Sequence, residues 1–298
     1  MDKDSLNILI SGANGFVGRH LYKLLSEKNN VFTIGRTSLE PNGSNFIKHD
    51  FESDNKIVLP NNIDVVIHLA AVTSTGKDVK KLYKTNIEGT HRLVTASIES
   101  NIKKFSFLSS AQVHGQTTFP GQPFTEESPY NPQDEYAKSK TEAEKIVREM
   151  CDISQVTDYI IIRPPLVYGK GVKGNYKLLE NIAAKSPLLP FENLDQNRRS
   201  LIHVDKLAKF IDFSVFSNQT NNQSYLVADE IDLSTKDLIK KLKHETKGNG
   251  VFIQFPWKFI EKIALKLGKE KSIVSLTKSL KLDNSKQEVL YNFRLYDY

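Results

Sequence analysis

The sequence is short of several features that would each indicate a particular class of protein. Its 298 residues include one cysteine, Cys151, so no disulfide can form within the chain, and we expect a reducing, cytoplasmic environment. No apolar run approaches the roughly 20 residues of a membrane span. The start lacks the basic region and long apolar region of a signal peptide. We therefore expect neither a membrane span nor a signal peptide.

Clustered metal ligands and clustered positive charge are also scarce. The net charge is +6, but the lysines are scattered, and neither a zinc-ligand spacing nor a basic block interleaved with aromatics accompanies them. We therefore expect no metal site and no nucleic-acid partner. A scattered basic excess is better explained as a field that attracts phosphorylated small molecules. Hydrophobic residues at 39% and charged residues at 26% exclude a mainly disordered chain.

Strand patterns alternate with helical patterns through the first half of the chain. Short apolar runs rich in β-branched residues lie at 6–12, 31–35, 45–50, 63–72, 103–110 and 158–169, with helical patterns at 15–28, 79–100 and from about 134. Pro164 and Pro165 should stop the last strand, because proline cannot continue a central ladder. The alternation predicts an α/β fold, a Rossmann-type doubly wound parallel sheet covered by helices on both faces.

The alternation loosens after about Leu166, which predicts two parts. We expect a dinucleotide-binding domain over residues 1–165 and a smaller, partly interleaved substrate lobe over 166–298. The segment near 200–217 is expected to return to the core of the first part.

A glycine-rich turn follows the first predicted strand. The stretch "SGANGFVG" places Gly12, Gly15 and Gly18 three residues apart. The first allows a tight turn, the second lets the backbone approach a pyrophosphate at the helix N-terminus, and the third allows close helix–strand packing. Such a triplet also occurs in ordinary turns, but its place between a strand and an amphipathic helix predicts dinucleotide binding, with Phe16 and Val17 also in contact.

The residues after the second strand bear on which dinucleotide is bound. An NAD site usually has an acid there for the ribose, whereas this chain has Gly35 and Arg36. Arginine favours the 2′-phosphate of NADP, so we expect NADP(H) to be preferred and NAD(H) to be possible. The alternative is a solvated Arg36 with Glu40 or another acid on the ribose. Asp50 is expected to reach the adenine or, alternatively, to cap a following helix.

The stretch "DEYAKSKTEAEKIV" reads as a solvated helix, yet it places Tyr136 and Lys140 four residues apart on one face. One interpretation is an ordinary side-chain contact. The other is proton transfer, because a free tyrosine has a pKa of about 10 and hardly exchanges its proton at neutral pH. A lysine ammonium beside it would stabilise tyrosinate and lower that pKa. Tyr136 could then give a proton to an alkoxide or take one from an alcohol.

Several motifs in order resemble the extended short-chain dehydrogenase/reductase family of nucleotide-sugar epimerases, dehydratases and 4-ketoreductases. They are "SGANGFVG", "HLAAV", "TNIEGTHRLV", "FLSSAQVHG", "YAKSK" and "RPPLVYG", extended by "GNYKLL" and "RRSLIHVDKLAKFI". The resemblance implies a catalytic trio of Ser110, Tyr136 and Lys140, in which Ser110 orients the reacting oxygen. Lys140 would also bond the nicotinamide ribose. Ser110 could instead be an ordinary serine of a turn at a strand end.

The resemblance also implies further binding residues. Those for the cofactor are Phe51, Leu69, Ala70, Ala71 and Pro164, besides the glycine turn, Arg36, Asp50, Tyr136 and Lys140. Asn175 and Arg199 would hold the diphosphate of the sugar nucleotide, with Arg198 as a neighbouring candidate. Alternatively, Asn175 is an ordinary asparagine at the start of a helix, and Arg198 and Arg199 are ordinary surface arginines. His203, His114 and Tyr168 are expected to be structural or to line the pocket.

Departures from the family patterns favour one reaction. Leu166 stands where 4-epimerases of the family have an asparagine, and Ala111 follows Ser110 where dehydratases have acids. With Arg36 in place of an acid, these predict NAD(P)H-dependent reduction of the C4 ketone of a UDP-4-keto-6-deoxy-N-acetylhexosamine for surface polysaccharide. The product would be UDP-N-acetylquinovosamine or UDP-N-acetylfucosamine. The alternative is a UDP-hexose or UDP-N-acetylhexosamine 4-epimerase with tightly bound NAD.

The expected partner is thus a UDP-sugar, and a homodimer is compatible with the sequence. The basic stretch "PWKFIEKIALKLGKEK" has Trp257, Phe259, Ile260, Ile263 and Leu267 on one side. It is expected to pack on the second lobe, and contact with a membrane surface is the alternative.

Overall fold

The computed structural model describes residues 5–40, 44–73, 78–257, 259, 266 and 270–291. Most of the stretch from Trp257 to Lys271, for which two roles were considered, lies outside these residues. Among the described helices, none is long and apolar enough to cross a membrane.

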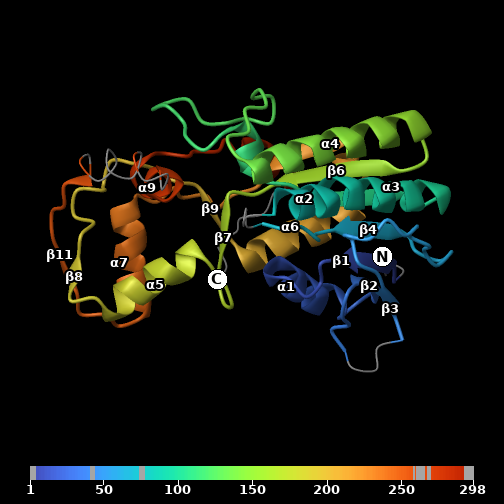
Figure 1. Cartoon of the computed structure of the whole chain (residues 1–298), viewed down its shortest axis with the longest axis horizontal. Coiled ribbons are helices and arrows are strands. Elements are labelled where there is room, and N and C mark those ends of the chain that lie inside the picture. The colour runs from blue at the N-terminus through green and yellow to red at the C-terminus, as the bar shows by residue number, and fades with distance from the viewer. Residues whose placement is uncertain are drawn as a thin grey trace.

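A parallel seven-stranded sheet forms the larger part of the molecule (Figure 1). Its strands are β1 (Asn7–Ser11), β2 (Asn30–Gly35), β3 (Phe46–Lys48), β4 (Val65–His68), β5 (Lys104–Leu108), β6 (Asp158–Arg163) and β10 (Gln223–Leu226). They are ordered β10-β6-β5-β4-β1-β2-β3, and all neighbours pair in parallel. The α/β, doubly wound fold expected from the sequence is confirmed.

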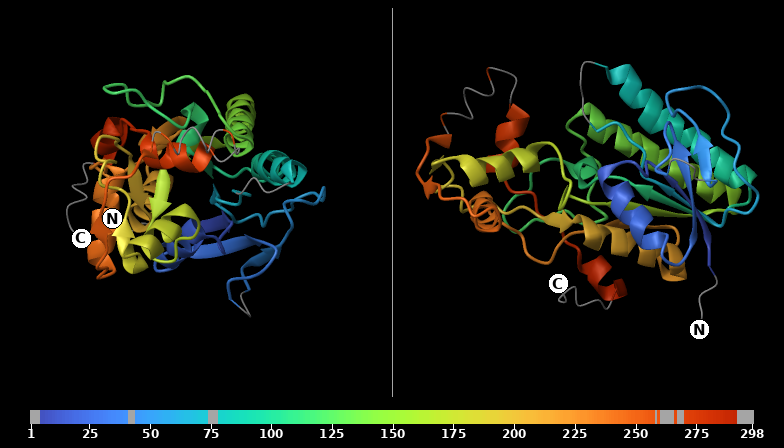
Figure 2. Two further views of the ribbon diagram at one scale, coloured as in Figure 1. Left: turned by 60° about the vertical axis from the view of Figure 1, so that its left-hand side comes forward. Right: turned by 90° about the horizontal axis from the view of Figure 1, so that it is seen from below.

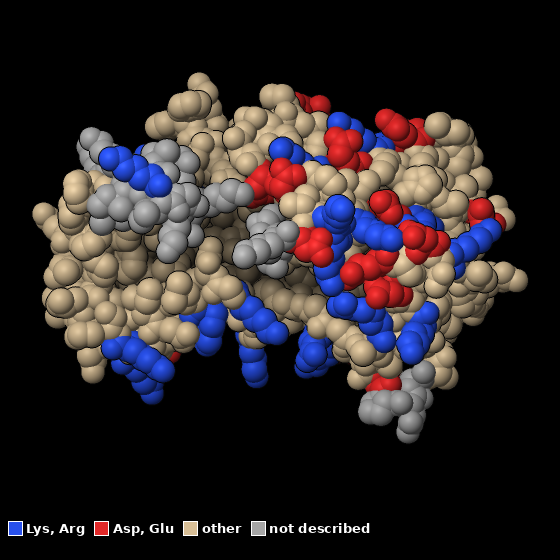
Figure 3. Space-filling model, viewed as in Figure 1, with Lys and Arg blue, Asp and Glu red and all other residues tan. Residues whose placement is uncertain are grey.

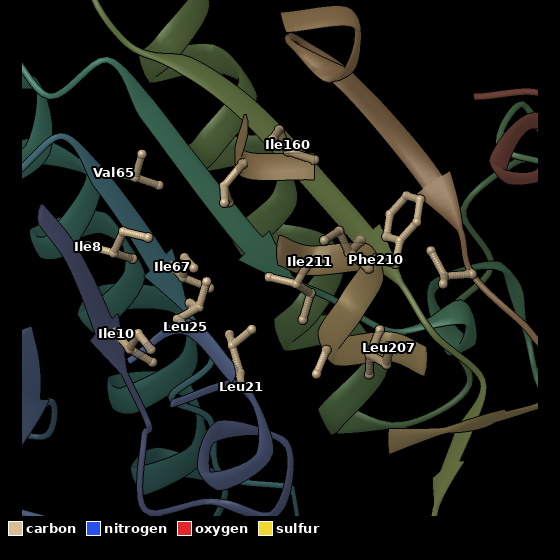
Figure 4. Close-up of a cluster of buried hydrophobic side chains, with 14 of the residues drawn as sticks. Ile8, Ile10, Leu21, Leu25, Val65, Ile67, Ile160, Leu207, Phe210 and Ile211 are labelled. Carbon is tan, nitrogen blue, oxygen red and sulfur yellow. The ribbon is translucent and has the colours of Figure 1, made fainter. Parts of the chain in front are cut away.

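Helices cover both faces of this sheet because its strands are apolar on both sides. On one face α1 (Phe16–Leu25) packs against α6 (Val204–Phe216), and their apolar side chains meet Ile8 and Ile10 of β1 (Figure 4). On the other face Leu9 lies in a second core with α3 (Gly89–Glu99) and α4 (Glu135–Ser154). The sheet is therefore buried on both faces, as expected for parallel strands.

A second group of elements lies beyond the carboxyl ends of the strands (Figure 2). It comprises α5 (Asn175–Lys185), α7 (Thr235–Glu245), α9 (Glu270–Thr277), the pair β7 (Leu166–Tyr168) with β9 (Leu201–His203), and the pair β8 (Leu188–Leu189) with β11 (Val251–Phe252). The chain returns to the sheet twice: between β9 and α7, where α6 packs on α1 and β10 pairs with β6, and after α9, where α10 (Ser285–Tyr291) contacts β10. The division at residue 165 stays a prediction.

Three features differ from the expected pattern. The long helix expected over 79–100 is broken into α2 (Val79–Tyr83), the π-helical turn η1 (Lys84–Glu88) and α3. The seventh strand, β10, was not expected, because its four residues "QSYL" begin with polar side chains and resemble a loop. The short helices η2 (Ala111–His114) and η3 (Asn218–Thr220) were also not expected.

Candidate active site

A cleft of about 1050 Å³ separates the carboxyl ends of the strands from the second group of elements (Figure 3). The glycine turn and α1 line one side, through Gly12, Asn14, Gly15, Phe16, Val17, Gly18, Arg19 and His20. Residues at or beyond the carboxyl ends of β4, β5 and β6 also line it: Leu69, Ala71, Thr73, Leu108, Ser109, Ser110, Ala111, Gln112, Pro164, Pro165 and Leu166. Ligands of open α/β sheets bind at this edge.

The glycine turn has the geometry that the spacing of its glycines predicts. Gly12 has a φ of +73°, and a Cβ there would lie 2.6 Å from the backbone nitrogen of Ala70. A Cβ at Gly18 would lie 2.2 Å from the carbonyl oxygen of Gly12, so both positions exclude a side chain. Gly15 precedes α1, whose first turn has no acid and no capping side-chain bond. The backbone N–H groups at this helix start are thus available to an anionic diphosphate, and the turn fits a dinucleotide.

A buried histidine holds the two chain segments at this turn together, and sequence reasoning missed it. The Ser11 hydroxyl lies 2.5 Å from Nδ1 of His68, and Nε2 lies 2.9 Å from the Thr90 hydroxyl. Because Thr90 donates its proton to the Asn86 carbonyl, it accepts from Nε2, and Ser11 donates to Nδ1. Burial lowers the pKa of His68 to about 3, so the ring is neutral. His68 is the first residue of the motif "HLAAV", but no role had been predicted for it.

The residues expected at the adenosine end lie outside the described lining of the cleft. Arg36 is exposed, and its Nη1 lies 3.7 Å from Oε1 of Glu52. Glu40 accepts a hydrogen bond of 2.6 Å from Tyr22. Asp50 caps a turn rather than a helix, accepting from the backbone N–H of Glu52 at 3.0 Å. Two neighbouring candidates are not in the lining either: Phe51 is buried in the core, and Ala70 packs behind the turn.

Ser110, Tyr136 and Lys140 all line the cleft, as the resemblance implies. Ser110 follows β5, and its Oγ accepts a hydrogen bond of 3.2 Å from the backbone N–H of Gln112. Tyr136 lies in the first turn of α4, which Asp134 caps by accepting from the N–H of Ala137. The Lys140 side chain is 2% exposed. The structure thus brings the three groups to one cleft, although their catalytic roles stay predictions.

The ionisation of this trio differs from the expectation. The Lys140 Nζ donates to the Leu108 carbonyl at 2.7 Å, and burial lowers its pKa to about 7, with the charge of Glu144 opposing the shift. The pKa of Tyr136 is raised, because the surrounding protein desolvates its hydroxyl and Asp134 adds negative charge. The expected lowering by lysine is therefore not seen, since desolvation outweighs the effect of four-residue spacing.

Asn86 in the π-helical turn supports the tyrosine, and sequence reasoning did not identify it. Its side chain is 1% exposed, accepts from the N–H of Val72 at 2.8 Å and donates to the Val72 carbonyl at 3.0 Å. It also donates to Ser139 at 3.0 Å, and Ser139 donates to the Tyr136 carbonyl at 2.8 Å. The sequence feature that could have pointed to Asn86 is the motif "TNIEGTHRLV", which contains it. The π-helical turn supports the same interpretation, because such turns often occur at functional sites.

The far side of the cleft carries the expected diphosphate ligands together with unexpected neighbours. Asn175, at the start of α5, and Arg199 both line it. Burial lowers the pKa of Arg199 to about 10, and its Nη1 donates to the Lys278 carbonyl at 3.0 Å. Arg198 instead donates to the carbonyls of Asp195 and Asn197. The residues missed here are Lys170, Gly171, Val172, Lys173, Tyr176, Leu178, Leu179, Leu201, Leu233, Ser234, Thr235, Leu238, Ser275, Leu276 and Leu280.

Behind the trio lies a buried ion pair. Arg163, at the end of β6, is 2% exposed in its side chain and donates from Nη2 to Glu144 Oε2 at 2.7 Å and from Nε to Oε1 at 3.0 Å. It also donates to Nε2 of His114 and to the Tyr130 hydroxyl, both at 3.0 Å. His114 is therefore structural. His203 caps α6, and Tyr168 donates to Asp229, so both also have structural contacts.

Within the described residues, no group of three or more His, Cys, Asp or Glu side chains could hold a metal ion.

The fold and the cleft are those of enzymes that use a dinucleotide. The sequence model of the NAD dependent epimerase/dehydratase family matches residues 8–228, and the chain belongs to this family. It is 35% identical over 245 residues to the UDP-glucose 4-epimerase of Vibrio cholerae, covering 79% of this chain and 74% of the relative.

Two solved structures have the same fold. The UDP-N-acetylglucosamine 4-epimerase of Bacillus cereus has a TM-score of 0.76 at 18% identity, covering 99% of this chain and 92% of that one. The UDP-glucuronic acid 4-epimerase of the same organism, in complex with NAD, has a TM-score of 0.75 at 19% identity, covering 98% and 94%.

Proposed function

We propose that this protein is a UDP-hexose or UDP-N-acetylhexosamine 4-epimerase that works with tightly bound NAD. The observation that carries the proposal is the placement of Ser110, Tyr136 and Lys140 in a cleft that also contains the glycine turn and the Asn175–Arg199 side. One space is thus available to a dinucleotide and a sugar nucleotide. The 35%-identical relative named as a UDP-glucose 4-epimerase supports this reaction.

The residues divide the chemistry between them. When bound, NAD supplies hydride transfer to and from C4 of the sugar. In its deprotonated form Tyr136 takes the proton of the O4 hydroxyl as C4–O4 becomes a ketone, and it returns this proton to O4 on reduction. Ser110 donates a hydrogen bond that orients O4, and Arg199 and Asn175 hold the diphosphate. Lys140, whose pKa of about 7 lets it titrate near neutrality, supplies charge beside the tyrosine when protonated.

The 4-ketoreductase expected from the sequence is the second candidate. It is favoured by one specific observation, Leu166, whose side chain is 43% exposed and lines the cleft where epimerases of the family place an amide. A reductase needs one presentation of a ketone, whereas an epimerase must present both faces of C4. The relatives favour the epimerase, which we therefore place first. A role in polysaccharide synthesis and a homodimer stay predictions.

A sugar-exchange assay separates the two reactions. We expect the purified protein, without added cofactor, to equilibrate UDP-glucose with UDP-galactose or UDP-N-acetylglucosamine with UDP-N-acetylgalactosamine, measured by chromatography. The reason is that hydride returned to the same sugar leaves no net oxidation. Lack of interconversion in both pairs, with stoichiometric consumption of NADH or NADPH on a UDP-4-keto-6-deoxy-N-acetylhexosamine, would establish the reductase instead.

The cofactor can be tested at Arg36. The sequence favours NADP, but Arg36 lies 3.7 Å from Glu52, which also pairs with Lys81 at 2.6 Å. Because Arg36 already pairs with Glu52, its guanidinium is less available to a 2′-phosphate, and we propose NAD as the cofactor. We expect NADH to bind at least as tightly as NADPH in fluorescence titrations of the protein freed of nucleotide. NADPH binding tighter by about tenfold or more, with the gap lost in Arg36→Ala, would restore the NADP preference.

A further inference from the structure

His20 joins three segments that are far apart in the sequence. It lies in α1, lines the cleft and is 23% exposed in its side chain. Its Nδ1 is 2.6 Å from Oδ1 of Asp205 in the first turn of α6. Its Nε2 is 3.1 Å from the backbone carbonyl oxygen of Lys170. The histidine thus ties the helix that follows the glycine turn both to α6 and to the segment between β7 and α5.

Both partners of this ring are oxygen atoms that can only accept. A carboxylate and a backbone carbonyl have no proton to give, so each bond needs an N–H on the ring. A neutral imidazole has one N–H, and the imidazolium has two. The arrangement around His20 is therefore satisfied only by the charged ring. Histidine side chains ordinarily change charge between pH 5 and 8.

The segment held by this ring is rich in glycine, and Val172 within it packs against a buried apolar cluster. Residues 169–174 read Gly-Lys-Gly-Val-Lys-Gly, and all three glycines have φ between +73° and +136°. A Cβ at Gly169 would lie 2.7 Å from a Val204 methyl, so this glycine fixes where the segment leaves β7. Among the described residues, His20 is the side chain that forms a hydrogen bond to the backbone of residues 170–173. The segment itself lines the cleft and leads into Asn175.

Negatively and positively charged side chains both lie near the His20 ring, and they act in opposite directions on its positive charge. Asp205 favours the imidazolium, and its other oxygen lies 3.7 Å from Nδ1 of His203. Arg19 on the same helix and Lys170 oppose it, although the Arg19 Nε donates to the Asn14 carbonyl. The ring of Phe16 meets the imidazole edge-on with centroids 5.7 Å apart. When the ring is neutral, the carboxylate keeps the remaining proton on Nδ1, and the unprotonated Nε2 then faces the Lys170 carbonyl.

We propose that His20 is a positioning residue whose imidazolium fastens residues 169–174 over the cleft, and that loss of its proton releases them. The segment would then open as the pH rises. The charge on His20 acts through the segment that carries Lys170 and leads to Asn175, without contact with the reacting atoms.

Limited proteolysis tests this directly, because trypsin cuts after lysine. We expect cleavage after Lys170 and Lys173 to be roughly tenfold faster at pH 8 than at pH 6, as for loss of one charge-assisted hydrogen bond. Rates are divided by the activity of trypsin on a small peptide at each pH, and circular dichroism confirms that each variant is folded. Equal corrected rates at the two pH values would overturn the proposal.

Three variants test whether the effect of His20 on residues 169–174 depends on the charge of its ring or only on the presence of a hydrogen bond. His20→Arg keeps a charge and two donors, so cleavage should be slow at both pH values. His20→Gln has donors on one nitrogen only, and its carbonyl oxygen would face the other acceptor, so cleavage should be fast at both pH values. Asp205→Asn lets a neutral ring keep its proton on Nε2, since the amide can donate to Nδ1, so cleavage should be slow and independent of pH. A pH dependence retained in Asp205→Asn, or wild-type rates in His20→Gln, would contradict the proposal.

Kinetics give a second measurement, which rests on the proposed function, whereas the proteolysis does not. Because the segment rather than the reacting atoms is released, we expect KM for the UDP-sugar to rise severalfold between pH 6 and 8 in the wild type relative to His20→Arg. The ratio of kcat between the two proteins should stay constant. A change confined to kcat would contradict the positioning role.

Discussion

Tyr136→Phe should lower kcat by roughly 10²–10⁴-fold, the usual contribution of a positioned acid–base group. The phenylalanine keeps the ring and the packing of α4 but cannot exchange a proton with the sugar hydroxyl. Desolvation raises the pKa of Tyr136, so the deprotonated form that can accept the O4 proton is the less populated form at neutral pH. The measurement is turnover at saturating sugar, with NAD binding and thermal unfolding as checks that the variant is intact.

Tyr83→Phe is the matched control for this result. Tyr83 donates a hydrogen bond to Glu135, the residue beside Tyr136, but it lies outside the described lining of the cleft. Removing its hydroxyl should change kcat by less than about threefold, within the range of an ordinary peripheral hydrogen bond. A Tyr136→Phe variant that retains most of its activity, or an equal loss in both variants, would exclude Tyr136 as the acid–base group.

The parts of the fold that were predictable depend on local pattern. The strand–glycine–helix order at Gly12, Gly15 and Gly18 specifies both a backbone conformation and its neighbours, so the turn follows from sequence. The i,i+4 spacing of Tyr136 and Lys140 likewise places both on one helical face, and both line the cleft.

Other parts depend on surroundings that no local pattern contains. The pKa of Tyr136 is set by desolvation, which depends on every segment packed around it. The expected cofactor contact of Arg36 stays a prediction, whereas its pairing with Glu52, which lies 16 residues further on, was not foreseen from the local pattern. Leu276 and Leu280 line the cleft although they come from the last third of the chain, and no role had been predicted for either residue. Long-range placement and burial were therefore beyond the sequence alone.

The buried pair behind the active site predicts the largest effect on stability. Glu144 is 0% and Arg163 is 1% exposed, and the pair is joined by bonds from both Nε and Nη2 of the arginine. Removing one partner of such a pair typically costs roughly 3–5 kcal/mol, because the other charge is left buried without compensation. We therefore expect Glu144→Gln to lower the free energy of unfolding by about this amount, measured by urea denaturation at pH 7.

Two further variants test whether the unpaired buried charge causes the loss of stability in Glu144→Gln. Glu142→Gln, two residues earlier on α4, breaks an exposed pair with Lys145 and should cost at most about 1 kcal/mol. Adding Arg163→Met to Glu144→Gln removes the unpaired charge, so the double variant should be more stable than Glu144→Gln alone. A Glu144→Gln variant no less stable than Glu142→Gln would mean that the pair contributes little.

The same pair predicts a pH dependence whose sign follows from the carboxylate. Burial alone would raise the pKa of Glu144, but the charge and hydrogen bonds of Arg163 outweigh it and hold that pKa below its ordinary value. A carboxyl group with a lower pKa in the folded than in the unfolded state stabilises the fold at pH values above its unfolded pKa, near 4.3. This contribution is lost as the pH falls through the folded value. The stability of the wild type should therefore approach that of Glu144→Gln in acid, and a gap that stays constant from pH 7 to pH 3 would exclude this linkage.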